Sequence, residues 1–118
     1  MRHESSYLQD IVVSCGRIEA IVAASSEADF LADQVLPPAM LHHLTVIGEA
    51  ISRLSVELRA RYPDVPWRQI IAVRHRIVHA YFDLDWQILW DTATDDIPGL
   101  RRQVLNILTT ELSESESA

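Results

Sequence analysis

The chain has 118 residues, enough for one domain with a substantial core and too few for two. Its net charge of -7 argues against a protein that coats nucleic acid, because non-specific phosphate binding needs a basic surface. Three glycines, five prolines and few alternating apolar patterns favour an all-α domain. The single cysteine, Cys15, rules out an internal disulfide, and its place in a helical apolar stripe predicts a buried side chain. No signal peptide or long apolar run is evident, which predicts a cytoplasmic protein.

Apolar spacing predicts two long helices in the first half of the chain. Residues 4–24 and 39–61 each carry apolar residues spaced alternately three and four apart, which fits antiparallel packing of one helix on the other. The two stripes are Leu8, Ile11, Cys15, Ile18 and Val22, and Leu44, Ile47, Ile51, Leu54 and Leu58. Between them, Ser25-Ser26-Glu27 predicts a break and a new N-cap, followed by a short helix that stops before Pro37. Gly48 costs about 1 kcal/mol inside a helix, so we expect another helix to approach closely there.

A rigid connector separates these helices from the next one. Prolines at 63 and 66 prevent the residue before each of them from continuing a helix. Pro66 suits the first turn of a helix predicted at 67–81, and Trp67 is expected to pin that turn to the core.

Acidic caps predict the starts of two further helices. Asp83-Leu84-Asp85 precedes an apolar segment at 86–94, and Asp95-Asp96 precedes a proline and a last apolar stripe at 98–112. Aspartate is a favoured N-cap residue, and proline is favoured in the first turn of a helix.

The ordered domain is predicted to span residues 1–112. Residues 113–118 form a short polar, acidic tail that we expect to fray. The helices together predict an antiparallel bundle of about five helices.

The segment at 70–82 combines core-forming residues with chemically active ones. Apolar residues recur at helical spacing and predict one buried side, while the remainder of the segment is polar. Its polar members are Arg74, His75, Arg76, His79 and Tyr81. Six of the ten basic residues, all arginines, fall between positions 53 and 76 with two acids, so this window carries +4 and the remainder -11. Such a patch suits a small anionic substrate, an RNA or an acidic partner, unless the arginines simply form a solvated helix face.

Arg74 and His79 are the strongest candidates for catalysis. They are five residues apart, about 140° around a regular helix, so they do not share one face. Both reach one phosphate if the helix distorts near Tyr81, or if two copies bring the same patch together across a two-fold axis. Arginine holds a phosphate through paired hydrogen bonds, and histidine moves a proton near neutral pH. Such a cleft is sufficient for metal-independent RNA cleavage, in which a 2′-hydroxyl attacks the adjacent phosphate.

Other interpretations of the segment stay open at this point. His75 and His79 lie one turn apart and can share a metal ion, although no third ligand has convincing spacing. That arrangement predicts a metal-dependent hydrolase. Either histidine can instead be structural, and Tyr81 can be an aromatic that packs while its hydroxyl reaches water.

Residues 74–81 closely resemble the R-x4-H-x-Y motif of HepT-like toxins, a branch of the HEPN superfamily. Further landmarks of that family occur here in the family's order and cover nearly the whole chain. They are Ile47-Gly48-Glu49-Ala50, Tyr62-Pro63-Asp64-Val65-Pro66-Trp67, Tyr81-Phe82-Asp83, Trp90 and Asp96-Ile97-Pro98-Gly99-Leu100. Together they are far more specific than an arginine and a histidine at the right spacing. His75 departs from the pattern, since the family usually has asparagine after the arginine.

The resemblance implies a dimeric HEPN-type bundle that acts as the ribonuclease toxin of a type II toxin–antitoxin system. Arg74 and His79 would be the catalytic pair at the dimer cleft, with no cofactor, and His75 and Arg76 would support them or contact RNA. It further implies an antitoxin of the minimal nucleotidyltransferase (MntA-like) type that transfers AMP to Tyr81. The alternative is a helical dimer without turnover that serves as a binding partner of a nucleotidyltransferase, which the substituted His75 and the acidic remainder of the chain favour.

Overall fold

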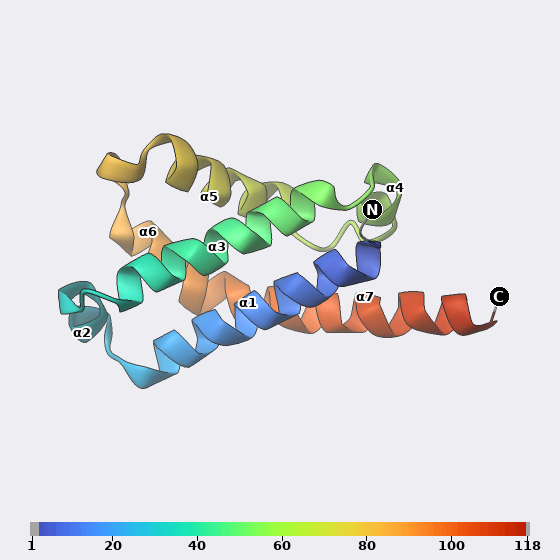
Figure 1. The fold of residues 1–118 in the computed structure, drawn as a ribbon, viewed down its shortest axis with the longest axis horizontal. Helices are drawn as coiled ribbons and strands as arrows, with labels where there is room; N and C mark the ends of the chain where they lie inside the picture. Colours follow the sequence, from blue (N-terminus) through green and yellow to red (C-terminus); the bar gives the residue numbers. More distant parts are fainter. Residues whose placement is uncertain (1–2, 118) are drawn as a thin grey trace.

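The computed structural model describes residues 3–117, and side chains within residues 3–112. In this range the fold is all-α, as predicted, with no strand. Four long helices run antiparallel to one another in chain order (Figure 1). They are α1 (Glu4–Ala24), α3 (Leu36–Arg53), α5 (Trp67–His79) and α7 (Ile97–Ser117). The helix α1 packs against both α3 and α7, and α3 also packs against α5, so α5 lies at one edge of the bundle.

Shorter helical segments connect the long helices. These are α2 (Glu27–Ala32), α4 (Val56–Arg61), the 3-10 turn η1 (Tyr81–Asp83), α6 (Trp86–Asp91) and the π-helix η2 (Thr92–Asp96). Caps predicted from the sequence start two of them: the Ser26 hydroxyl accepts a hydrogen bond from the Asp29 amide, and the Asp85 carboxylate accepts from the amide of Gln87. In the described part of the chain, no helix is long and apolar enough to cross a membrane.

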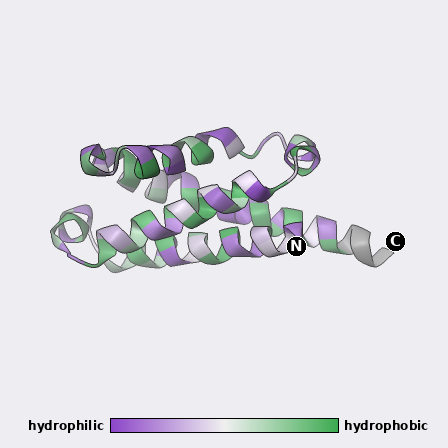
Figure 2. Ribbon diagram, turned by 45° about the horizontal axis from the view of Figure 1, so that its top comes forward, coloured by the Kyte–Doolittle hydropathy of each residue, from purple (hydrophilic) through white to green (hydrophobic). Residues whose placement is uncertain are grey.

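The core lies where the predicted stripes meet. Apolar positions recur as bands along the helices (Figure 2). All five residues of the α3–α4 stripe are buried, as are the first four of the α1 stripe, whose last member, Val22, is partly buried. Cys15 is fully buried, which confirms the prediction for the lone thiol. Phe30 of α2 closes one end of the bundle, with ring centroids 6.0 Å from Trp86 and 5.0 Å from Trp90.

The second long helix differs from its prediction at both ends. It begins at Leu36, because both prolines fit the first turn, where a missing N–H costs no hydrogen bond. It ends at Arg53, so the prediction of one helix through Arg61 is wrong. Leu54 adopts an extended conformation, and Ser55 starts α4 as a new N-cap whose hydroxyl accepts from the Leu58 amide at 3.1 Å.

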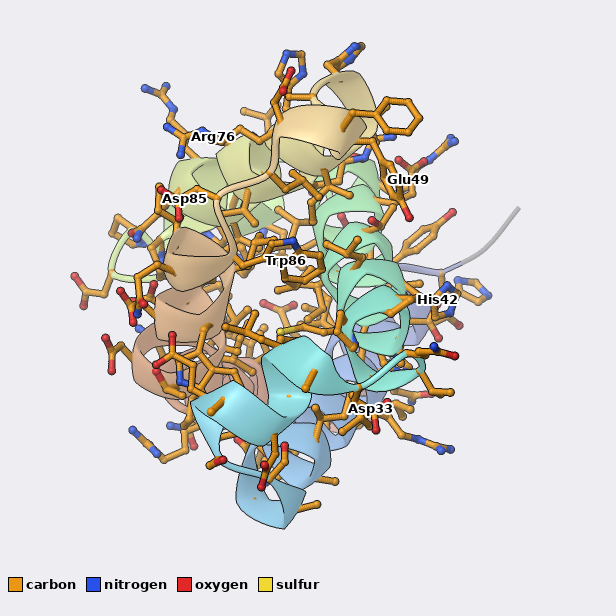
Figure 3. All side chains as sticks on the ribbon, turned by 90° about the vertical axis from the view of Figure 1, so that its left-hand side faces the viewer. Asp33, His42, Glu49, Arg76, Asp85 and Trp86 are labelled. Atoms are coloured by element: carbon orange, nitrogen blue, oxygen red, sulfur yellow. The ribbon has the colours of Figure 1, made fainter. Side chains whose placement is uncertain are left out.

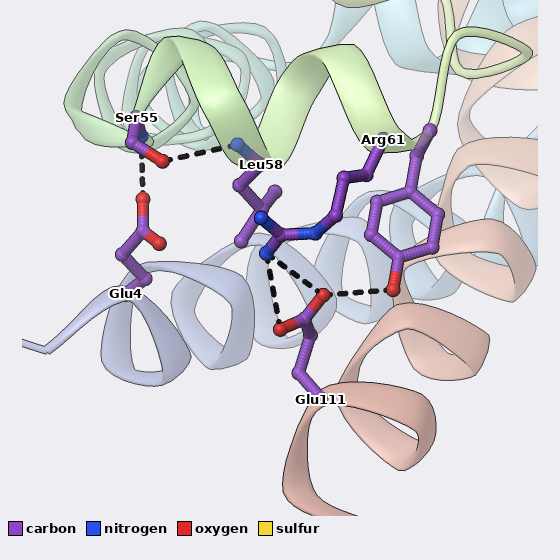
Figure 4. A network of polar contacts seen from close by, with 6 residues as sticks. Glu4, Ser55, Leu58, Arg61 and Glu111 are labelled. Carbon is purple, nitrogen blue, oxygen red and sulfur yellow. Dashed lines mark hydrogen bonds and ion pairs between the residues drawn. The ribbon is translucent and has the colours of Figure 1, made fainter. Parts of the chain in front are cut away.

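Polar contacts tie this break and α4 to α1 and α7 (Figure 4). The Glu4 carboxylate on α1 accepts the backbone N–H of Ser55. Further along, Glu111 on α7 accepts from Arg61 Nη2 at 3.0 Å and from the Tyr62 hydroxyl at 2.8 Å. The connector then leads into α5, and Trp67 is buried with its indole N–H shared between two backbone carbonyls, as its predicted anchoring role requires.

The final helices are continuous, so the predicted cap at Asp95-Asp96 is wrong. The segment runs as α6, η2 and α7 without leaving helical backbone angles. Pro98 explains the π-helix between them: proline lacks an N–H, and its ring clashes with the carbonyl four residues earlier in a regular α-helix. The wider turn relieves that clash, and the amide of Ile97 donates to Thr92 O, five residues back.

The end of the last helix also lies beyond its prediction. The helix α7 continues to Ser117, five residues past the predicted end at residue 112. Residue 118 and the side chains of 113–117 lie outside the described part of the chain, so the fraying of the tail stays a prediction.

Candidate active site

The helix α5 is apolar and buried on one side and polar on the other, as the spacing of its apolar residues predicts. Four apolar residues are buried against the bundle: Trp67, Ile70, Val73 and Ile77. The predicted site residues occupy the rest of its circumference, where Arg74 is half-buried and His75, Arg76 and His79 are exposed. The amphipathic pattern therefore fixes which side chains reach solvent.

Arg74 lies where α5 crosses α3. A Cβ on Gly48 would stand 2.7 Å from the Arg74 Cγ and closer still to its Cβ, so the stem of Arg74 occupies the space that the glycine leaves. This confirms the predicted close helix approach and identifies its partner. The Nη2 atom of Arg74 forms an ion pair with Glu49 Oε2 at 3.0 Å, and its Nε is buried without a hydrogen-bond partner in the described structure.

The two histidines of the motif form a pair at the exposed end of α5. The ring centroids of His75 and His79 are 4.2 Å apart, with the ring planes inclined by 41°. Among the described residues, no group of three or more histidine, cysteine, aspartate or glutamate side chains is arranged to hold a metal ion. The helix ends at His79, where Ala80 has φ -130° and ψ 37° and donates its amide to Arg76 O. Arg74 therefore pairs with Glu49 of α3, while His79 lies at the C-terminal end of α5 and packs beside His75.

Exposed aromatic residues follow directly after His79. Tyr81 is 54% exposed and Phe82 is 96% exposed, with their rings 5.5 Å apart and nearly perpendicular. Val78, one residue before His79, is 48% exposed. A cluster of large apolar side chains in solvent is unusual on a monomeric surface and typical of an interaction site.

Arg76 lies apart from Arg74. Figure 3 shows Arg76 and Asp85 on one side of the molecule and Glu49 and His42 on the other. Arg76 lines a cavity of about 310 Å³ between the end of α5 and α6, together with Asp83 and Asp85 and with apolar residues of both helices.

Three arginines of the basic window are paired with carboxylates. Arg53 and Arg74 share the carboxylate of Glu49, and Arg61 is paired with Glu111. Glu49 is the residue of this site that sequence reasoning did not single out. It lies in the family landmark Ile47-Gly48-Glu49-Ala50, but no spacing rule links position 49 to position 74.

Comparison with known proteins decides the family. A family model described as ribonuclease HepT-like matches residues 11–107. The chain belongs to the HepT-like ribonuclease family. This agrees with the family and the enzyme class, an endoribonuclease, predicted from the motif.

Two relatives match over most of their length. A protein of Caldanaerobacter subterraneus subsp. tengcongensis named "Putative RNase" is 36% identical over 111 residues, covering 94% of this chain and 99% of the relative. A protein of Thermococcus cleftensis named "Probable ribonuclease HepT" is 34% identical over 100 residues, covering 85% and 91%. No solved structure gives a significant match.

Proposed function

We propose that the protein is a metal-independent endoribonuclease, the toxin of a toxin–antitoxin pair, and that two copies build its active site. The observation that supports this most is the placement of Arg74 and His79 in one chain. Arg74 is tied to α3 through Glu49, whereas His79 projects at the open end of α5 beside His75. In one copy the Arg74 guanidinium and the His79 imidazole therefore lie at separate places. Two copies with their α5 ends related by a two-fold axis would bring both groups to one phosphate.

The exposed surface around His79 supports pairing of two copies. Val78 and Phe82 would lose their contact with water at such an interface, and burial of apolar area is the main driving force for association. The same pairing would place two His75–His79 pairs across the cleft from each other.

In this cleft the proposed chemistry needs only groups that the chain supplies. His79 removes the proton of the ribose 2′-hydroxyl, whose oxygen attacks the adjacent phosphorus. Arg74 stabilises the negative charge that develops on the phosphate oxygens. The bond from phosphorus to the 5′-oxygen breaks, and a protonated histidine of the second copy donates a proton to that oxygen. The products are a 2′,3′-cyclic phosphate and a 5′-hydroxyl end.

We propose that a minimal nucleotidyltransferase antitoxin silences this site through Tyr81. The Tyr81 hydroxyl would attack the α-phosphate of ATP, forming a bond to AMP and releasing pyrophosphate. The exposure of Tyr81, two residues after His79, makes it accessible to such a partner. The added AMP would bring bulk and negative charge to the cleft and compete with RNA phosphate for Arg74.

The test is an RNA cleavage assay with total tRNA and messenger RNA, in the presence of a chelator. We expect the unmodified wild type to cleave and Arg74→Ala and His79→Ala to lose cleavage while each remains a folded dimer in sedimentation and circular dichroism. His42→Ala is a matched control, because it removes an exposed histidine on α3, away from the end of α5. Full activity in His79→Ala, or loss of wild-type activity with chelator, would refute the proposed chemistry.

A separate measurement, the gain in protein mass, tests the adenylylation of Tyr81. Co-expression with the cognate nucleotidyltransferase is expected to add the mass of AMP to the wild type and nothing to Tyr81→Phe. An equal gain on both would place the modification on another residue. A dimeric, unmodified wild type that binds the partner and leaves RNA intact would favour the binding-partner alternative.

A further inference from the structure

The carboxylate of Glu49 on α3 contacts two guanidinium groups, one on α5 and one on α3 itself. Its Oε2 lies 3.0 Å from Arg74 Nη2 on α5, and its Oε1 lies 3.2 Å from both Arg53 Nη2 and Arg53 Nε, one turn further along α3. Ion pairs that water reaches contribute little to stability, because water screens them and the long side chains lose freedom, and here the side chains of Arg74 and Glu49 are 31% and 42% exposed. Stabilisation of the fold is therefore a weak explanation for a carboxylate beside the proposed catalytic arginine.

The surroundings of Arg74 restrict its guanidinium group. Its stem lies against Gly48, and its Nε is buried. Glu49 binds Nη2 from the side of α3. Because 31% of the Arg74 side chain is exposed, a phosphate can still reach the guanidinium group.

We propose that Glu49 is a positioning residue that holds Arg74 in the orientation needed for catalysis, an inference that rests on the proposed ribonuclease function. Gly48 and Glu49 act on the same side chain: the glycine gives the stem of Arg74 its place, and the carboxylate fixes the rotation of its planar end. Fixed donors stabilise a transition state better than mobile ones, because the cost of ordering them is met during folding.

The same carboxylate has an opposite effect on substrate binding. A negative charge near the phosphate site weakens the attraction of RNA in its ground state. Removing the charge while keeping the size of the side chain, as in Glu49→Gln, is therefore expected to lower KM and kcat together. Loss of a transition-state interaction and loss of folded or dimeric enzyme both lower the apparent kcat, so kcat is calculated per folded dimer, measured by sedimentation and circular dichroism.

The experiment measures kcat and KM for RNA cleavage by the wild type and Glu49→Gln. We expect kcat to fall about tenfold, less than the roughly hundredfold loss that a misplacement of about 1 Å can cause, while KM also falls. Two controls isolate the contact with Arg74. Glu57→Gln removes an exposed acid of the same basic window on α4, and Arg53→Gln removes the other partner of Glu49; both should keep kcat within about threefold, the scatter of single surface changes.

Each outcome bears on the proposal in a defined way. A lower KM with unchanged or higher kcat would mean that Glu49 only competes with RNA, and a wild-type kcat per folded dimer would mean that any loss of activity comes from lost folded enzyme; either result overturns the positioning role. Absence of cleavage by the wild type would instead refute the ribonuclease function. In that event, NMR measurement of rotation about the Arg74 Nε–Cζ bond still tests the restraint, which predicts faster rotation in Glu49→Gln than in the wild type.

Discussion

The substitution Gly48→Ala tests the contact between α3 and α5 directly. Alanine normally stabilises a helix interior relative to glycine by about 1 kcal/mol. Here the new methyl group would stand 2.7 Å from the Arg74 Cγ and closer still to its Cβ, and the position of Cβ is fixed by the backbone of α5. Rotation of a flexible side chain cannot relieve this overlap, so the helices must move apart.

The expected cost follows from these two effects. Overpacking of a tight contact costs roughly 1–3 kcal/mol, and the severity of this overlap places it near the upper end. After the gain in helix propensity, the free energy of unfolding should fall by about 2 kcal/mol. For a domain of this size, that corresponds to a decrease in Tm of about 8 °C. Activity should fall as well, because the movement displaces Arg74.

Two other glycines provide matched controls for urea and thermal unfolding. A Cβ on Gly16 would lie 3.7 Å from its nearest neighbour, and one on Gly99 would lie 3.8 Å away, both ordinary contacts. Gly16→Ala and Gly99→Ala should therefore stabilise the protein by about 0.5–1 kcal/mol. Pairing Gly48→Ala with Arg74→Gly should recover stability, whereas pairing it with Arg74→Ala should not, because alanine keeps the Cβ. Equal stabilisation by all three alanines would refute the reasoning.

Two further predictions concern the core and the α4–α7 contact. Burial, reinforced by the neighbouring charge of Glu19, raises the pKa of Cys15 to about 12, so its thiol should resist iodoacetamide at pH 8.5 in the folded protein and react fully in urea. Because the folded state keeps this proton while an unfolded thiol releases it near its usual pKa of 9.0, stability should decrease as pH rises from about 9 towards 12, and Cys15→Ala should reduce that decrease. Glu111→Ala removes the acceptor of Arg61 and Tyr62 and should cost about 1–2 kcal/mol in urea unfolding. Glu57→Ala, an exposed acid on α4, should change stability by less than about 0.5 kcal/mol, and equal effects of the two would contradict the role of the Glu111 contact.

The sequence predicts the long helices well because their buried residues recur regularly. It does not reveal the break at Leu54, since Leu54 and Leu58 are both buried and the stripe continues across the break. The cap at Ser55 was the available signal, but serine also occurs inside helices. For the final helices the error is the opposite one, because the sequence predicts a break where the helix is continuous. Asp95-Asp96 before Pro98 has the pattern of an N-cap, but the π-helix makes the proline compatible with a continuous helix.

For the site, local spacing predicts the angular separation of Arg74 and His79, and the structure keeps them apart in one chain. Spacing also predicts a close approach at Gly48 from its cost inside a helix. It cannot predict that Arg74 is the residue that fills this place, or that Glu49 pairs with it, because both contacts depend on how two distant helices cross. The roles of Arg74, His79 and Tyr81 in catalysis and modification stay predictions until they are measured.

The π-helix has a consequence for which sequence changes this chain tolerates. A single π turn is equivalent to one residue inserted into an α-helix, and each residue turns an α-helix by about 100°. Deleting one residue from Thr92–Asp96 would therefore rotate all of α6 relative to α7. Leu89 would leave the core, and Trp90 would leave Phe30. A substitution at Asp95, the exposed position of this segment, should be accepted, whereas packing at the far end of the bundle does not allow the segment to lose or gain a residue.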